Sequence, residues 1–304
     1  MRLSLLLSSS ALLATAAASG TGALMFCLGV KKADGSCKFQ ADYALDFAAL
    51  GPYSKAVRIY STSDCNTMQE IMPAAKAAGF KVLLGIWATD ADHFALEKTT
   101  VQKFLPLYRD QVSAITVGSE HLYRGDLTGT QLAAQITEVR NLVKGLGYTD
   151  IPIGTADSWN KYKDGTADPV IAVSDILLTN SFSFWEGQSK ADMTTRFFNN
   201  IGQALAKIEA IKGTSDFTFY VGETGWPTSG SAYDQAVPDL ATAELHWQST
   251  ICGLRHWGIN LSVFEAFDEP WKPAAIGDNG VALPETSWGV FTSDRKLKYK
   301  SLSC

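Results

Sequence analysis

The sequence of 304 residues lacks the signatures of several large classes of protein. It contains neither GxGxxG nor GxxxxGK[ST], the glycine-rich loops with which many proteins bind dinucleotides or nucleoside triphosphates. Its 4 histidines form no HxH or HExxH spacing, which argues against a zinc enzyme. The net charge of -5 comes without the basic stripe that binds nucleic acids. We therefore expect no metal, no cofactor and no nucleic-acid partner.

Long apolar segments are equally scarce. No segment after the N-terminus is apolar enough to cross a bilayer, and the C-terminal KLKYKSLSC lacks the hydrophobic tail of a lipid-anchor signal. The N-terminal MRLSLLLSSSALLATAAASG combines one arginine, a short apolar run and small residues suited to cleavage. This pattern is typical of a secretory signal peptide and is too short for a membrane span. We expect a signal peptide over residues 1–18, one secreted domain over residues 19–304, and no membrane partner.

The sequence has only 5 cysteines. Secretion permits disulfides, and an odd number leaves at least one thiol unpaired. Cys27 lies in an apolar run and is the best candidate for a buried free thiol. Cys37 with Cys65, and Cys252 with Cys304, are candidate pairs, although the sequence does not fix the pairing.

Short strand-like runs alternate with helical patterns along the whole chain. The runs begin at Ala23, Lys55, Lys81, Val112, Ile151, Asp175, Phe217 and Asn260. Most are continuously apolar, as strands buried on both faces should be. Eight βα units predict a single-domain (β/α)₈ (TIM) barrel. An open doubly wound sheet is the alternative, but its first turn would normally be rich in glycine.

The helical patterns differ in regularity. Apolar residues recur at intervals of three and four after Thr130 and after Asp192, and a third helix is predicted over residues 67–78. The stripe after Asp239 is looser, although it still predicts a helix.

Two of the predicted strands end in a glutamate that follows a glycine. Glu120 closes the fourth run in ITVGSEHLYRG, and Glu223 closes the seventh in FTFYVGETGWPTS. The carboxyl ends of barrel strands carry the active site. Two carboxylates about 5 Å apart perform retaining glycoside hydrolysis, one as nucleophile and one as acid/base. A salt-bridged or capping role is the alternative for each glutamate taken alone, but the repeated context favours a catalytic pair.

Four segments resemble one known family. VGETGWPTSG is similar to the nucleophile signature of glycoside hydrolase family 17, and ITVGSEHLYRG to its acid/base segment. FEAFDEPWK and ETSWGVF resemble two later landmarks. The similarity spans essentially the whole mature chain. It is strongest to the fungal cell-wall branch of β-1,3-glucanases and β-1,3-glucanosyltransferases.

The resemblance implies a catalytic (β/α)₈ barrel with Glu223 as nucleophile and Glu120 as acid/base. Further positions match family residues of the cleft: Tyr60, Glu269, Lys272 and Glu285. Glu269 and Lys272 match positions that support the catalytic pair. The chain also departs from the family, because Ser119 replaces an asparagine found in many members. Phe182 and Phe184 stand where an aromatic residue with a hydroxyl is frequent.

A β-1,3-glucan needs aromatic platforms and polar ligands along a cleft. The candidate platforms lie near the predicted strand ends: Trp87, Tyr123, Trp159, Trp185, Trp226 and Trp271. Trp185 with Glu186 resembles an acceptor-side wall of the fungal branch, and Asn180 is a candidate ligand for a sugar hydroxyl. Core packing is the alternative for any single tryptophan. We expect His121, next to the acid/base, to lie in a loop or on the surface.

The resemblance favours a monomeric β-1,3-glucanosyltransferase of the cell wall that binds β-1,3-glucan and hydrolyses it as a side reaction. A predominantly hydrolytic endo-β-1,3-glucanase is the first alternative. The others are a retaining glycosidase of mannan or cellulose, and a non-catalytic glucan-binding wall protein.

Overall fold

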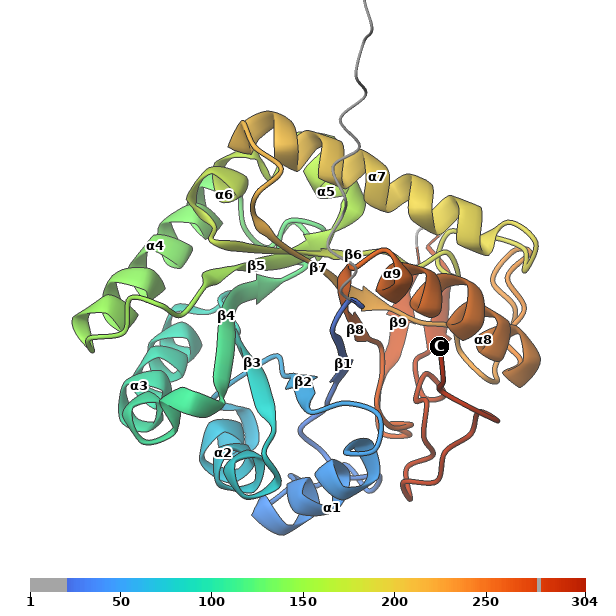
Figure 1. The fold of residues 1–304 in the computed structure, drawn as a ribbon, viewed down its shortest axis with the longest axis horizontal. Helices are drawn as coiled ribbons and strands as arrows, with labels where there is room; N and C mark the ends of the chain where they lie inside the picture. The colour runs from blue at the N-terminus through green and yellow to red at the C-terminus, as the bar shows by residue number, and fades with distance from the viewer. Residues whose placement is uncertain (1–20, 278–279) are drawn as a thin grey trace, which may run out of the picture.

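The protein is described here by a computed structural model that covers residues 21–277 and 280–304. Eight parallel strands form a closed barrel in sequence order, with β1 paired to β8 (Figure 1). The strands are β1 Leu24–Cys27, β2 Ala56–Arg58, β3 Lys81–Ile86, β4 Val112–Ser119, β5 Ile153–Ser158, β6 Ile176–Asn180, β7 Thr218–Thr224 and β8 Asn260–Val263. The predicted (β/α)₈ barrel is confirmed. The predicted signal peptide lies outside the described residues.

Helices surround the barrel on its outside (Figure 1). They are α1 Gln40–Leu50, α2 Thr67–Ala78, α3 Ala91–Tyr108, α4 Gly129–Gly145, α5 Trp159–Lys163, α6 Asp168–Val173, α7 Met193–Lys212, α8 Leu240–His246 and α9 Cys252–His256. Short 3₁₀ turns occupy Asp64–Asn66 and Arg109–Gln111. The predicted helix over residues 67–78 is confirmed with its ends unchanged.

The looser stripe after Asp239 has a structural cause. The segment Trp247–Ile251 between α8 and α9 is a π-helix, which has more residues per turn than an α-helix. The apolar positions therefore drift from the 3.6-residue period while Trp247, Ile251 and Leu254 all remain buried.

The barrel is packed on both faces. Alternate residues of β3 belong to different apolar clusters. Val82 and Leu84 belong to the large cluster that includes the surrounding helices, whereas Leu83 belongs to a smaller second cluster. That group also contains Met25, Ala114 and Leu178, which come from other strands. Burial on both faces explains why the strands have continuously apolar sequences.

Both candidate disulfide pairs are present. Cys37 is bonded to Cys65, and Cys252 to Cys304, while Cys27 is a buried free thiol. The first bond ties the β1–α1 connection to the segment before α2, and the second ties α9 to the C-terminal residue. None of the described helices is long and apolar enough to cross a membrane.

A hairpin follows β8 that the sequence pattern did not predict. Its strands β9 Ala274–Ile276 and β10 Ala282–Pro284 pair antiparallel. They are three residues each and mostly exposed or half-buried, so neither a continuous nor an alternating apolar pattern marks them. Gly277 lies against the ring of Tyr233, where a Cβ atom would come within 2.4 Å of Cε2. The hairpin is thereby seated on the β7–α8 connection.

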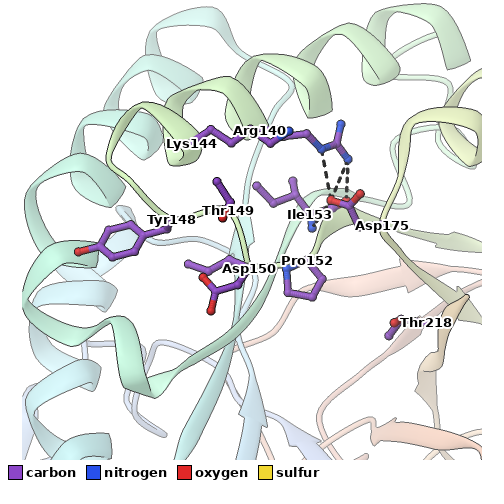
Figure 2. Close-up of a pocket in the computed structure, with 10 residues that line it drawn as sticks. Arg140, Lys144, Tyr148, Thr149, Asp150, Pro152, Ile153, Asp175 and Thr218 are labelled. Carbon is purple, nitrogen blue, oxygen red and sulfur yellow. Dashed lines mark hydrogen bonds and ion pairs between the residues drawn. The ribbon is translucent and has the colours of Figure 1, made fainter.

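A small cavity of about 270 Å³ lies at the amino ends of β5, β6 and β7 (Figure 2). Figure 2 shows the guanidinium of Arg140, from α4, directed at the carboxylate of Asp175. Arg140 Nε and Nη2 lie 3.2 and 3.1 Å from Asp175 Oδ2, which also accepts from the Ile153 amide at 3.1 Å. Contacts at this end of a barrel serve stability rather than catalysis.

We expect Asp175→Ala to lower the melting temperature by roughly 2–4 °C, because it removes a half-exposed ion pair and a backbone acceptor together worth about 1 kcal/mol. Activity should be unchanged, since this carboxylate is at the opposite end of the barrel from the strand-end glutamates. Calorimetry beside Asp216→Ala, an exposed aspartate before β7, provides the control. Equal melting temperatures for the two variants would contradict the stabilising role.

Candidate active site

A cavity of about 730 Å³ opens at the carboxyl ends of the strands. It gathers most of the residues predicted from the sequence. Those that line it are Tyr60, Trp87, Ser119, Glu120, Tyr123, Trp159, Asn180, Trp185, Glu186, Glu223, Trp271, Lys272 and Glu285. Glu120 and Glu223, from the ends of β4 and β7, therefore face one shared space, as the barrel geometry predicts.

Glu120 sits directly after β4 on an unusual backbone. Its φ of +56° is in the left-handed region, and Gly118 two residues earlier has φ of +78°. The Glu120 amide still donates to the carbonyl of Ala156 on β5 at 2.9 Å. This turn ends the regular pairing of β4 and carries the side chain to the cavity, where Asn180 Nδ2 donates to Glu120 Oε1 at 3.0 Å.

Burial and the charge of Glu223 raise the pKa of Glu120 to about 8. The hydrogen bond from Asn180 and the positive charge of Arg124 act in the opposite direction. A carboxyl group with this pKa is protonated at neutral pH and can donate a proton, which is the property required of a general acid.

Glu223 lies within β7 and is 6% exposed. Arg58 Nη1, from β2, forms a 2.8 Å ion pair with Glu223 Oε1 and a 2.9 Å hydrogen bond with the carbonyl of Gly222. Arg58 Nη2 lies 3.1 Å from Ser119 Oγ at the end of β4. One guanidinium thus fixes the orientation of Glu223 and contacts the strand that precedes Glu120. Ser119 Oγ accepts this hydrogen bond from Arg58, and Ser119 also lines the cavity.

Sequence reasoning missed Arg58. The signal was a charged residue inside the apolar run AVRIY, where burial is expected to require a partner. The structure buries Arg58 completely and places it over the ring of Tyr60 at 4.8 Å. Tyr60 itself lines the cavity, as predicted.

Lys272 lies in a group of carboxylates after β8. Its Nζ forms an ion pair with Glu269 at 2.9 Å and another with Glu265. Burial raises the pKa values of Glu265 and Glu285, while the nearby lysine opposes both shifts. Glu269 is buried behind Lys272 rather than lining the cavity, and Glu265 is a member that the sequence reasoning missed. Lys272 itself lines the cavity and therefore places a positive charge at the cleft.

Aromatic side chains form one wall of the cleft. Trp185 stacks on Trp288 with 5.8 Å between ring centroids and an interplanar angle of 21°, and its side chain hydrogen-bonds to Glu285. Phe182 lines the same cavity and meets Trp288 edge-on. Phe184 is buried beneath Trp185. The wall is therefore rigid and apolar, with the Glu285 carboxylate at its edge.

Burial corrects one expectation and narrows another. Trp226 is 1% exposed and its Nε1 donates to the carbonyl of Val237, so it offers no face to a ligand. His121 lies in the turn after β4, one of the two expected places, but it is completely buried, with the Ala88 amide donating to its Nε2 at 3.2 Å. Both residues stabilise the loops around the cleft.

The carboxylate of Glu186 is already engaged. Arg196 Nη2 lies 2.9 Å from its Oε1, and Asn200 Nδ2 lies 2.6 Å from its Oε2. Glu186 lines the cavity, but its oxygens are shared with these two partners. Within residues 21–277 and 280–304, no group of three or more His, Cys, Asp and Glu side chains is placed to hold a metal ion.

Comparison with known proteins assigns the family. The BtgE/BtgC glycoside hydrolase domain matches residues 26–289. The chain belongs to this family. It is also 45% identical over 293 residues to a glucan 1,3-beta-glucosidase of Saccharomyces cerevisiae, covering 94% of this chain and 92% of that protein. A glucan 1,3-beta-glucosidase of Schizosaccharomyces pombe is 46% identical over 294 residues, covering 95% and 89%.

A solved structure supports the same assignment. The glycoside hydrolase family 17 beta-1,3-glucanosyltransferase of Rhizomucor miehei superimposes with a TM-score of 0.77 at 29% identity. The alignment covers 90% of this chain and 94% of that one. The resemblance to family 17 is therefore confirmed, and the chain is a glycoside hydrolase or transglycosylase.

We expect Glu223→Gln to lower the pKa of Glu120 from about 8, because the substitution removes the neighbouring negative charge while burial remains. Titration of the Glu120 carboxyl carbon by NMR would measure this pKa. Glu138→Gln, which changes an exposed carboxylate on α4, is the matched control and should leave the value unchanged. An unaltered pKa in Glu223→Gln would show that the two groups do not interact.

Proposed function

We propose that the chain is a retaining β-1,3-glucan-active enzyme that cleaves glucan through a covalent glycosyl-enzyme and transfers the glycosyl unit to a glucan acceptor, with hydrolysis as a side reaction. The observation that carries this proposal is the pair formed by Glu120 and Glu223, which line one cavity in different environments. The names of the relatives, glucan 1,3-beta-glucosidase and beta-1,3-glucanosyltransferase, support the choice of substrate.

The two glutamates divide the chemistry. A Glu223 oxygen attacks the anomeric carbon, the glycosidic C–O bond breaks, and Glu120 gives its proton to the departing oxygen. In the second step the Glu120 carboxylate takes a proton from an acceptor hydroxyl, whose oxygen displaces Glu223 from the sugar. Two displacements at one carbon return the original configuration. Arg58 holds Glu223 in place throughout, because it is buried with both Nη1 and Nη2 bonded.

Transfer rather than hydrolysis requires that a sugar hydroxyl reach the intermediate ahead of water. The stacked pair of Trp185 and Trp288 supports an acceptor site, because a flat indole binds the apolar face of a glucose unit. The Glu285 carboxylate beside it offers an acceptor for sugar hydroxyls. The hydrolytic alternative is favoured by the glucosidase names of the relatives, so the balance between the two outcomes needs a direct test.

The remaining assignments follow from the same proposal. Residues 19–304 would form one catalytic domain, released from the signal peptide at residues 1–18. Export to the cell wall fits the two disulfides, since such bonds persist in oxidising compartments. The enzyme would act as a monomer without cofactor.

Product analysis on laminari-oligosaccharides tests the proposal. Wild type should form products longer than the substrate, and initial products should retain the β configuration by NMR. Only shorter products would establish hydrolysis, and initial α products would overturn the retaining mechanism. Mannan and cellulose oligosaccharides run in parallel distinguish the substrate classes. Binding to insoluble glucan with no product at all would identify a non-catalytic protein.

Glu223→Ala should lose nearly all turnover, because no other group can form the glycosyl-enzyme, and should melt at a lower temperature, because it leaves the buried Arg58 without its carboxylate. A cooperative thermal melt above the assay temperature establishes folding. Substantial residual turnover would exclude Glu223 as the nucleophile.

Trp185→Ala should reduce transfer to added sugar acceptors more than it reduces hydrolysis, because it removes the acceptor-side surface and leaves both glutamates intact. The ratio of long to short products measures the effect. Trp257→Ala is the matched control, since this tryptophan is 67% exposed on the segment leading into β8, away from the cleft. An equal loss of both reactions would argue against an acceptor role for Trp185.

A further inference from the structure

One buried side chain from the neighbouring strand accepts hydrogen bonds from the turn that follows Glu120. Asp157, near the end of β5, is completely buried. Its Oδ2 accepts from the Leu122 amide at 2.9 Å, and its Oδ1 accepts from the Tyr123 amide at 3.1 Å. Oδ1 also accepts from the Ser158 amide at 2.8 Å. The carboxylate thus bonds the end of β5 to the backbone amides two and three residues after Glu120.

This arrangement offsets backbone strain at Glu120. A non-glycine residue in the left-handed region is strained by about 1–2 kcal/mol, so Glu120 would leave this conformation unless its surroundings held it. The Glu120 amide is bonded to Ala156 on one side, and Asp157 holds the chain two and three residues further on. Adjacent residues of β5 therefore secure both ends of the turn.

We propose that Asp157 is a positioning residue for the reaction, whose carboxylate fixes the turn that presents Glu120 to the departing glycosidic oxygen. The assignment rests on the proposed function of Glu120 as acid/base. Asp157 does not line the cavity, so it acts through the backbone rather than on the substrate.

Its charge supports the same role. Glu223 and Asp157 both raise the pKa of Glu120, whereas Arg124 lowers it, and Arg58 is a further buried cation whose charge interacts with Glu120. Removing the charge of Asp157 should therefore lower the pKa of Glu120 and move the alkaline limb of the pH–rate profile to lower pH. A side chain that only stabilised the fold would leave this limb in place.

Two substrates distinguish positioning of Glu120 from general damage. Cleavage of a laminari-oligosaccharide needs proton donation, because a sugar alkoxide is a poor leaving group. A 2,4-dinitrophenyl β-laminaribioside releases a stable phenolate and needs no proton, so its pre-steady-state burst reports attack by Glu223 alone. Asp157→Asn keeps the size of the side chain but turns an amide donor towards one of the backbone N–H groups. Asp157→Glu retains the charge and displaces it, and it serves if the first variant does not fold.

Asp157→Asn should lose about 10²-fold in turnover of the oligosaccharide, the contribution typical of a general acid, while the dinitrophenolate burst stays close to the wild-type rate. Glu120→Gln should show the same pattern. Asp164→Asn, an exposed aspartate after α5, should leave both substrates unaffected. Equal losses on the two substrates, or no loss on either, would overturn the proposal.

Amide exchange separates this proposal from the proposed function. The Leu122 and Tyr123 amides should exchange faster in Asp157→Asn than in Asp164→Asn, whatever the substrate proves to be. If wild type cleaves neither glucan substrate, the proposed function fails, and the exchange rates still decide whether Asp157 holds the turn. Unchanged exchange at both amides would refute that role.

Discussion

The ion pair between Arg58 and Glu223 is the interaction on which the site depends. A buried guanidinium is costly unless its nitrogens are bonded, and here a carboxylate, a carbonyl and a hydroxyl satisfy Nη1 and Nη2. These partners come from β7 and from the end of β4. The guanidinium therefore links the two strands that carry the glutamates, because a shift of β7 would break the ion pair with Glu223 and a shift of the β4 end would break the hydrogen bond with Ser119.

The cleft places several carboxylates close together, and the unequal distribution of cations gives them different properties. Glu223 receives Arg58, and Glu265 and Glu269 share Lys272. Glu120 receives only an uncharged amide from Asn180, so burial and its neighbours keep its proton in place. Two residues of the same type are thus prepared for different steps by what lies beside them, which is how one fold carries out both acid and nucleophilic chemistry near neutral pH.

Much of the architecture could be predicted because the strands obey a simple rule. Burial on both faces makes most of the strands continuously apolar, so all eight were found and the barrel followed. Glu120 and Glu223 were recognisable because a carboxylate interrupts each run where the strand ends. Asp157 and Arg58 gave weaker signals, since a charged residue inside a strand shows that a partner exists without identifying it. Their main partners lie on other strands or in the turn after β4, and only the closed barrel brings them together.

Aromatic residues were harder to assign than charged ones. Trp185 and Trp226 both follow strand ends, yet one faces the cleft and the other packs beneath it. The direction depends on loop backbones that have no periodicity. The β9–β10 hairpin escaped prediction for a related reason, because three-residue strands are too short to show a pattern.

The free thiol of Cys27 has a practical consequence. It is 1% exposed beneath the catalytic cleft, and burial raises its pKa to about 12, so the reactive thiolate hardly exists in the native fold. Since the other described cysteines are bonded in pairs, an alkylating reagent can label this chain only when the barrel comes apart. The rate of labelling would therefore measure how often the barrel opens, because Cys27 is a natural reporter buried inside it.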